Sequence, residues 1–190
     1  MKSICSKVCL AGATAAFLLA SGALLAQTRT PESQRAQSNA SRHANAPYND
    51  EQFVRNAAEA SMSQVDIGKV AEQRSQNPEV KKFAQMMVEE HSKLTEQLKQ
   101  LGMSENVNLP TSVTRDDANA HRSLAAMNGP TFDRQYLGRV NSELHRQLGE
   151  FERGASLGTK PALKDYAQRT QPTLQAEIQQ VKQLLTRVGR

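Results

Sequence analysis

The sequence predicts an all-α fold: an antiparallel four-helix bundle with a long crossover between helices two and three. Three observations predict it. Four segments place apolar residues three or four positions apart, the spacing of an amphipathic helix, and none alternates with the period of a strand. Only a few residues join the first segment to the second, or the third to the fourth. About thirty residues, 101–130, separate these two pairs.

Capping residues set the expected bounds of each helix. The first helix is expected over residues 50–75, with Asn49 as its N-cap. The second begins at Asn77-Pro78, where Asn caps and Pro occupies the first turn, and is expected to end at Gly102. The third covers residues 131–158 and the fourth begins at Pro161. A short helix is predicted within the crossover, near residues 115–127.

An internal repeat relates the two halves of the domain. The segment Pro-Glu-Val-Lys-Lys-Phe-Ala-Gln, residues 78–85, recurs as Pro-Ala-Leu-Lys-Asp-Tyr-Ala-Gln, residues 161–168. Phe53 opens the first helix as Phe132 opens the third. Two duplicated helical hairpins with one long crossover define the ferritin-like layout. The alternative is a chance match between two amphipathic helices.

The N-terminus has the order of a secretory signal peptide, predicted over residues 1–26. Lys2 and Lys7 precede an uncharged stretch rich in Ala, Leu and Gly, which ends at the small residue Ala26. The alternative is a retained transmembrane anchor, because the uncharged run approaches the roughly 20 residues that span a bilayer. Neither Cys5 nor Cys9 follows the hydrophobic run as a lipidated cysteine would.

Composition divides the rest into a polar linker, residues 27–48, and the helical domain, residues 49–190. The linker has almost no large apolar side chain and is therefore predicted to be disordered. Cleavage after residue 26 would remove both cysteines and leave 22 Lys and Arg against 19 Asp and Glu, a net charge of +3. We expect no nucleic-acid partner, because no basic stripe with interleaved aromatics is present.

Four polar residues are candidates for a metal site inside the bundle. They are Asp66, His91, His145 and Glu177, one on each predicted helix. His91 lies in an apolar row with Phe83, Met87, Leu94 and Leu98. Glu177 lies between Leu174 and Val181, and Asp66 between Met62 and Val70. Carboxylate and imidazole groups at corresponding depths in four helices are compatible with a single transition-metal ion.

A dinuclear centre of the ferritin type needs two Glu and two Glu-x-x-His motifs. Val88 stands three residues before His91, and Ser142 three before His145, so neither histidine has that partner. The other interpretation of the four residues is a buried polar network that fixes the register of the helices without catalysis. The remaining histidines, His43 and His121, are expected at the solvated surface.

Several segments resemble a family of bacterial exported proteins, domain of unknown function 4142. They are Phe-Ala-Gln-Met-Met-Val-Glu-Glu-His (83–91), Phe-Asp-Arg-Gln-Tyr (132–136) and Pro-Thr-Leu-Gln (172–175), and the resemblance covers about residues 50–188. It implies a ferritin-like bundle in the periplasm or associated with the outer membrane, and it supplies no reaction. The family usually has His where this chain has Glu177, and a second His at the position of Leu144.

Two functions of different class follow from these observations. The first is a non-enzymatic envelope protein that binds a protein or other envelope partner, as in stress tolerance, with no integral membrane span after signal cleavage. The second is a metal-binding or metal-dependent oxidative protein with a degenerate site. The incomplete ligand set favours the first.

Overall fold

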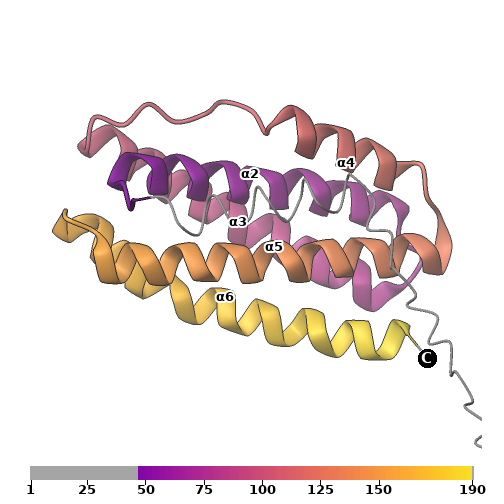
Figure 1. Cartoon of the computed structure of the whole chain (residues 1–190). Coiled ribbons are helices and arrows are strands. Elements are labelled where there is room, and N and C mark those ends of the chain that lie inside the picture. Colours follow the sequence, from indigo (N-terminus) through magenta and orange to yellow (C-terminus); the bar gives the residue numbers. More distant parts are fainter. Residues whose placement is uncertain (1–46, 190) are drawn as a thin grey trace, which may run out of the picture. The chain divides into compact units, whose positions relative to one another are not determined.

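A computed structural model describes residues 47–189, which form five helices and no strand, and this confirms the all-α prediction (Figure 1). The predicted signal peptide, the linker up to residue 46 and His43 lie outside the described residues. No helix within residues 47–189 is long and apolar enough to cross a membrane. The helices are α2 (Asp50–Arg74), α3 (Pro78–Ser104), α4 (Arg115–Ala125), α5 (Gly129–Leu157) and α6 (Pro161–Val188).

The predicted N-caps are present. The Asn49 side-chain oxygen accepts a hydrogen bond from the Gln52 backbone N–H at 2.9 Å, and Asn77 accepts one from Glu79 at the same distance. Each bond satisfies one of the backbone donors that the first turn of a helix leaves free. Thr114 caps the short crossover helix α4 in the same way.

Helix α3 continues past Gly102 and ends at Ser104, two residues beyond the predicted end. Asn106 takes the left-handed conformation, with φ of 56°, and the Val107 N–H donates to the Gly102 carbonyl at 2.8 Å. This is a Schellman motif with Asn in place of the usual Gly. Gly102 serves packing instead: a Cβ there would lie 3.0 Å from Leu109 Cγ and 3.1 Å from the Val107 carbonyl oxygen, so a larger residue would displace the crossover by a few tenths of an ångström.

This cap predicts that alanine and glycine at position 106 affect the free energy of unfolding differently. Asn106→Ala is expected to lower the free energy of unfolding by about 1 kcal/mol, because alanine lacks the short polar side chain whose local hydrogen bonding lets Asn adopt the left-handed region. Asn106→Gly is expected to leave it unchanged or raise it slightly, because glycine adopts that conformation freely. Urea unfolding of both variants checks this. Equal destabilisation by Ala and Gly would show that the Asn side chain, and not its backbone conformation, ends the helix.

The long helices pack as two hairpins, α2 with α3 and α5 with α6. Polar contacts at both ends show that α3 and α6 run antiparallel. Arg187 pairs with Glu79 at 2.9 Å at one end, and Lys160 pairs with Glu105 at 2.9 Å at the other. At the start of α2, Asp50 accepts a hydrogen bond from the Thr159 N–H beyond the end of α5. Helix α4 lies against α2 and α5 (Figure 1).

The buried positions of α3 and α6 follow the same pattern when the two helices are aligned by the sequence repeat. Every buried position of α3 from Val80 to Leu98 has a buried counterpart in α6 when Pro78 is aligned with Pro161. The pairs are Val80 and Leu163, Phe83 and Tyr166, Ala84 and Ala167, Met87 and Thr170, His91 and Leu174, Leu94 and Glu177, Leu98 and Val181. His91 and Glu177 are therefore polar replacements at positions where the other hairpin has leucine.

Candidate functional site

His91 of α3 and Glu177 of α6 meet in the core of the helical domain. They are 0% and 2% exposed, respectively. His91 Nε2 lies 3.4 Å from Glu177 Oε2, longer than the 2.7–2.9 Å of a charge-assisted hydrogen bond. None of the two ring nitrogens and two carboxylate oxygens has a hydrogen-bond partner in the described structure. The two side chains are therefore close together and buried, and they form no hydrogen bond in the described structure.

Local sequence explains why both side chains point inward. On α3, Phe83, Met87 and Leu94 are buried at helical spacing around His91. On α6, Leu174 and Val181 flank Glu177 and are both fully buried. Because the apolar rows fix the rotation of each helix, the polar residue within a row has to point into the core.

Two buried glutamines of α2 and α5 add polarity to the core. Gln64 is 3% exposed, and neither atom of its amide group has a partner. A Cβ at Gly68, one turn further along α2, would lie 2.7 Å from Val88 of α3. Since α2 and α3 form a hairpin, Gln64 is opposite the next turn of α3, which contains His91. Gln147 of α5 donates to the Ser61 hydroxyl at 3.4 Å.

The structure leaves the other two predicted ligands at the surface. Asp66 and His145 are both exposed, while their neighbours Ile67 and Leu144 are buried. Of the four predicted residues, only His91 and Glu177 are brought together. Within residues 47–189, no three side chains of His, Cys, Asp or Glu are clustered so that they could hold a metal ion.

A dinuclear carboxylate centre does not fit these residues. His91 and Glu177 provide one imidazole and one carboxylate, and the buried glutamines of α2 and α5, Gln64 and Gln147, provide only neutral amides. Two divalent cations need several carboxylates to balance their charge. The described side chains therefore supply neither the charge nor the number of ligands.

His121 is buried, contrary to the expectation of a solvated position. It is 7% exposed, and its Nε2 lies 3.2 Å from the Ser63 hydroxyl of α2. Only two residues of α4 are buried, His121 and Leu124, and they form the face that lies on the domain. The ion pair between Asp117 and Arg139 joins α4 to α5. His121 therefore helps to hold the crossover in place.

Burial, and secondarily the nearby Arg139, lower the pKa of His121. Asp117, Asp66 and Glu143 act in the opposite direction. The unfolded chain therefore binds a proton more readily than the folded one. The contribution of neutral His121 to the free energy of unfolding is complete above the ordinary histidine pKa of about 6.5. It is lost as the pH falls below that value and through the lowered pKa of the folded state.

We predict that His121→Gln removes this part of the pH dependence. Wild type should lose more free energy of unfolding than the variant between neutral pH and a pH well below about 6.5. Glutamine keeps a polar group near Ser63 and does not titrate. Parallel urea unfolding curves across this pH range check the difference. If the wild-type and variant curves stay the same distance apart, then protonation of His121 does not oppose docking of α4.

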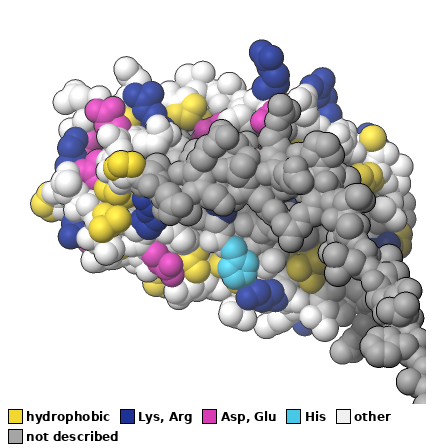
Figure 2. All heavy atoms as spheres, in the orientation of Figure 1, with side chains coloured by type: hydrophobic (Ala, Val, Ile, Leu, Met, Phe, Trp, Pro, Cys, Tyr) yellow, Lys and Arg dark blue, Asp and Glu magenta, His cyan; other side chains and the backbone are white. Residues whose placement is uncertain are grey.

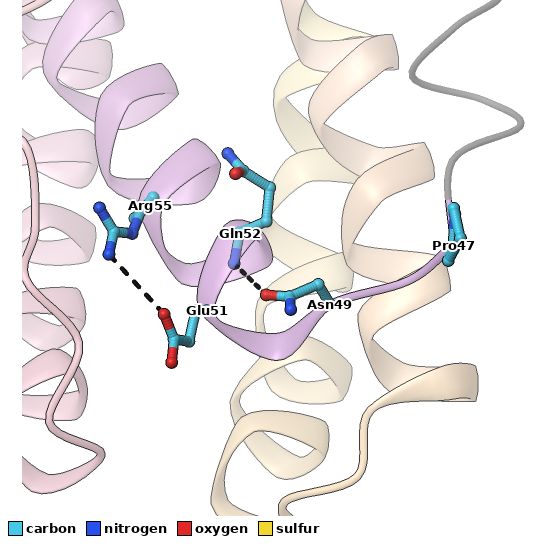
Figure 3. Close-up of a pocket in the computed structure, with 5 residues that line it drawn as sticks. All are labelled: Pro47, Asn49, Glu51, Gln52 and Arg55. Carbon is cyan, nitrogen blue, oxygen red and sulfur yellow. Dashed lines mark hydrogen bonds and ion pairs between the residues drawn. The ribbon is translucent and has the colours of Figure 1, made fainter.

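The surface of residues 47–189 includes two hollows. One, at the start of α2, is lined by Pro47, Asn49, Glu51, Gln52 and Arg55 (Figure 3). Its side chains bond mainly to their own helix: Asn49 caps Gln52, and Glu51 pairs with Arg55 (Figure 3). It follows that Asn49, Glu51 and Arg55 in this hollow already have hydrogen-bond or ion-pair partners at the start of α2.

The second hollow is a groove of about 370 Å³, which we call the crossover groove. It lies between α2, α3 and the chain that leads into α4, and it includes the predicted ligand Asp66. Apolar, charged and hydroxyl side chains line it: Met62, Val65, Asp66, Ser92, Thr95, Glu96, Lys99, Thr111, Ser112 and Val113. Basic, acidic and apolar side chains are also mixed on the face shown in Figure 2.

The fold and the buried pair define an all-helical protein with an ionisable His–Glu pair in its core. The chain belongs to the family described as domain of unknown function (DUF4142), which matches residues 33–184. No curated protein matches the chain, and neither does any solved structure. The family carries no assigned activity, so the function has to be argued from the residues.

Proposed function

We propose that this chain is an exported, non-enzymatic protein of the cell envelope, a four-helix bundle of ferritin-like layout that acts by binding a partner. The burial of His91 and Glu177 carries the proposal. Catalysis by this pair would require a substrate to reach it, and the two side chains are 0% and 2% exposed. Metal-dependent oxidation, the other function considered, would need the same access. Partner binding needs only the surface.

The crossover groove is the binding surface that the geometry supports best. Met62, Val65 and Val113 are half-buried, so they offer apolar area without being part of the core. Lys99 and Glu96 can bind charged groups of a partner, although they form an ion pair at 3.3 Å in the described structure. A non-obligate protein interface is about as apolar as the rest of a protein surface, so the mixed composition of this groove is compatible with partner binding.

Export is tested by fractionating cells and determining the N-terminus of the accumulated protein. We expect the protein in the envelope fraction, beginning at Gln27, because Ala26 is the predicted residue before cleavage. Accumulation in the cytoplasm with residues 1–26 intact would refute the proposed location. An uncleaved chain in the membrane fraction would instead support the anchor.

Binding is tested by photocross-linking in cells from single cysteines. The two native cysteines lie within residues 1–26, so the processed chain would contain only the introduced thiol. Ser112→Cys places the probe in the crossover groove, and Ser142→Cys places it on the exposed side of α5 as a control. A discrete adduct from Ser112→Cys alone is expected. The same adducts from both positions would exclude the groove as the specific site.

A further inference from the structure

The junction of α4 and α5 contains an asparagine followed by a glycine, Asn128 and Gly129 (Figure 1). No other asparagine in the sequence precedes a glycine. This order matters chemically, because the backbone nitrogen of the following residue can attack the side-chain amide carbon of an asparagine. A side chain on the following residue crowds that attack, and glycine has none. Asn128 is therefore the asparagine of this chain with the least hindered neighbour.

The side chain of Asn128 is exposed and is not held by the helix that it precedes. It is the N-cap residue of α5, yet it makes no side-chain hydrogen bond to the first turn. Asn49 and Asn77, the N-caps of α2 and α3, both accept such a bond from the backbone. A cap bond fixes the amide group away from the following nitrogen. The Asn128 amide has no such restraint.

The peptide group between Asn128 and Gly129 is also loosely held. Gly129 is the first residue of α5, and the first N–H groups of a helix have no partner within it. The Asn128 carbonyl accepts a bond from the Phe132 N–H at 3.4 Å, longer than the usual 2.7–3.2 Å. At Gly129, where φ is 60°, no described atom lies within 4 Å of the place that a Cβ would occupy.

Ring closure requires a rotation about the Cα–C bond of Asn128, which has a ψ of 163°. This rotation brings the Gly129 nitrogen towards the side-chain carbon Cγ of Asn128. It breaks only the long bond from Phe132, and the open space at Gly129 accommodates it. The structure therefore permits the approach that the reaction needs.

We propose that Asn128 is a site of spontaneous deamidation, with water as the only co-reactant. A base in the solvent removes the Gly129 amide proton, and this nitrogen forms a bond to Asn128 Cγ. The Cγ–Nδ2 bond breaks, and Nδ2 takes up a proton from water and leaves as ammonia, so that a succinimide ring is formed. Water then opens the ring at either carbonyl and gives aspartate or isoaspartate. Nothing is oxidised or reduced. This goes beyond the proposed function, because it needs no partner.

The two products should affect the start of α5 in opposite ways. The first turn of α5 has no acidic residue, so an aspartate at the N-cap would add a carboxylate beside the positive end of the helix. In isoaspartate the main chain passes through Cγ. The carbonyl that accepts the bond from Phe132 is then no longer part of the main chain, and the junction becomes one atom longer.

The site is tested by keeping the purified, folded protein at mildly alkaline pH for days and following the tryptic peptide of residues 123–134 by mass spectrometry. We expect the amide of Asn128 to be lost progressively, with both aspartate and isoaspartate as products. Asn128→Gln should keep its amide, because the longer side chain would have to close a six-membered ring. Asn128→Asp, which is one of the two products, should have a higher Tm than freshly prepared wild type.

Asn108 is the matched control within the same chain, because it is exposed and outside any helix but precedes Leu109. Its amide should be retained while that of Asn128 is lost. Equal conversion at both positions would overturn the role of Gly129. Loss of the Asn128 amide in guanidinium-unfolded chain, but not in folded protein, would show that the fold protects the site and would overturn the proposal. A Tm of Asn128→Asp at or below that of wild type would overturn the effect assigned to aspartate.

Discussion

His91→Ala is expected to lower the free energy of unfolding by about 3–5 kcal/mol. The substitution removes the ring nitrogen that lies 3.4 Å from Glu177 Oε2 and leaves a cavity, and breaking a buried acid–base pair by removing one partner typically costs this much. Glu177 is 2% exposed and neither of its oxygens has another partner, so the substitution leaves its carboxyl group in the core without a protein partner. Urea unfolding of the wild type and the variant measures the loss.

The double variant His91→Leu/Glu177→Leu should recover that loss. Leucines already occupy the corresponding positions of the other hairpin, Leu174 and Leu94, and both are buried. Replacing a buried ion pair by apolar residues is often neutral or stabilising by about 1–4 kcal/mol. A double variant as unstable as His91→Ala would mean that the pair itself, and not the isolated charge, determines stability.

The sequence predicted the helices and the inward direction of His91 and Glu177 because apolar rows carry this information. Each of the two residues stands within a row whose other members are fully or almost fully buried, so its direction follows from its neighbours. Asp66 has the same spacing from Met62 and Val70, but these are only half-buried. The row containing Asp66 lies at the edge of the buried face, and spacing alone does not distinguish edge from centre.

The buried amides and His121 were missed for different reasons. Gln64 lies one turn from Ile67 and Gly68 on the buried face, so the row could have revealed it. An amide is a weaker metal ligand than a carboxylate or an imidazole, so Gln64 does not stand out among candidate ligands. His121 lies on a short helix whose buried face holds only two residues, too few to define a periodic row. Its burial depends on α4 docking against α2 and α5, a tertiary contact.

Phe53→Ala is expected to lower the free energy of unfolding by about 3–5 kcal/mol, the usual cost of truncating a buried aromatic residue. Phe53 of α2 is 2% exposed, and its ring packs edge-on against Phe151 of α5 with centroids 5.2 Å apart. The same ring lies over Gly154, where a Cβ would come within 2.9 Å of it. This contact joins the two hairpins near the end of α5.

The effect of Gly154→Ala on the free energy of unfolding should therefore change sign when Phe53 is replaced by alanine. In wild type it is expected to destabilise by about 1–3 kcal/mol, because the Phe53 ring has to move. In the Phe53→Ala background it should stabilise by about 1 kcal/mol, since alanine is the better helix former once the ring is gone. Gly149→Ala, on the same helix with no atom near its Cβ, should stabilise in both backgrounds. Thermal and urea unfolding of the four combinations at residues 53 and 154 measure the coupling. If Gly154→Ala costs the same in both backgrounds, the ring is not what keeps position 154 small, and the two hairpins are joined elsewhere.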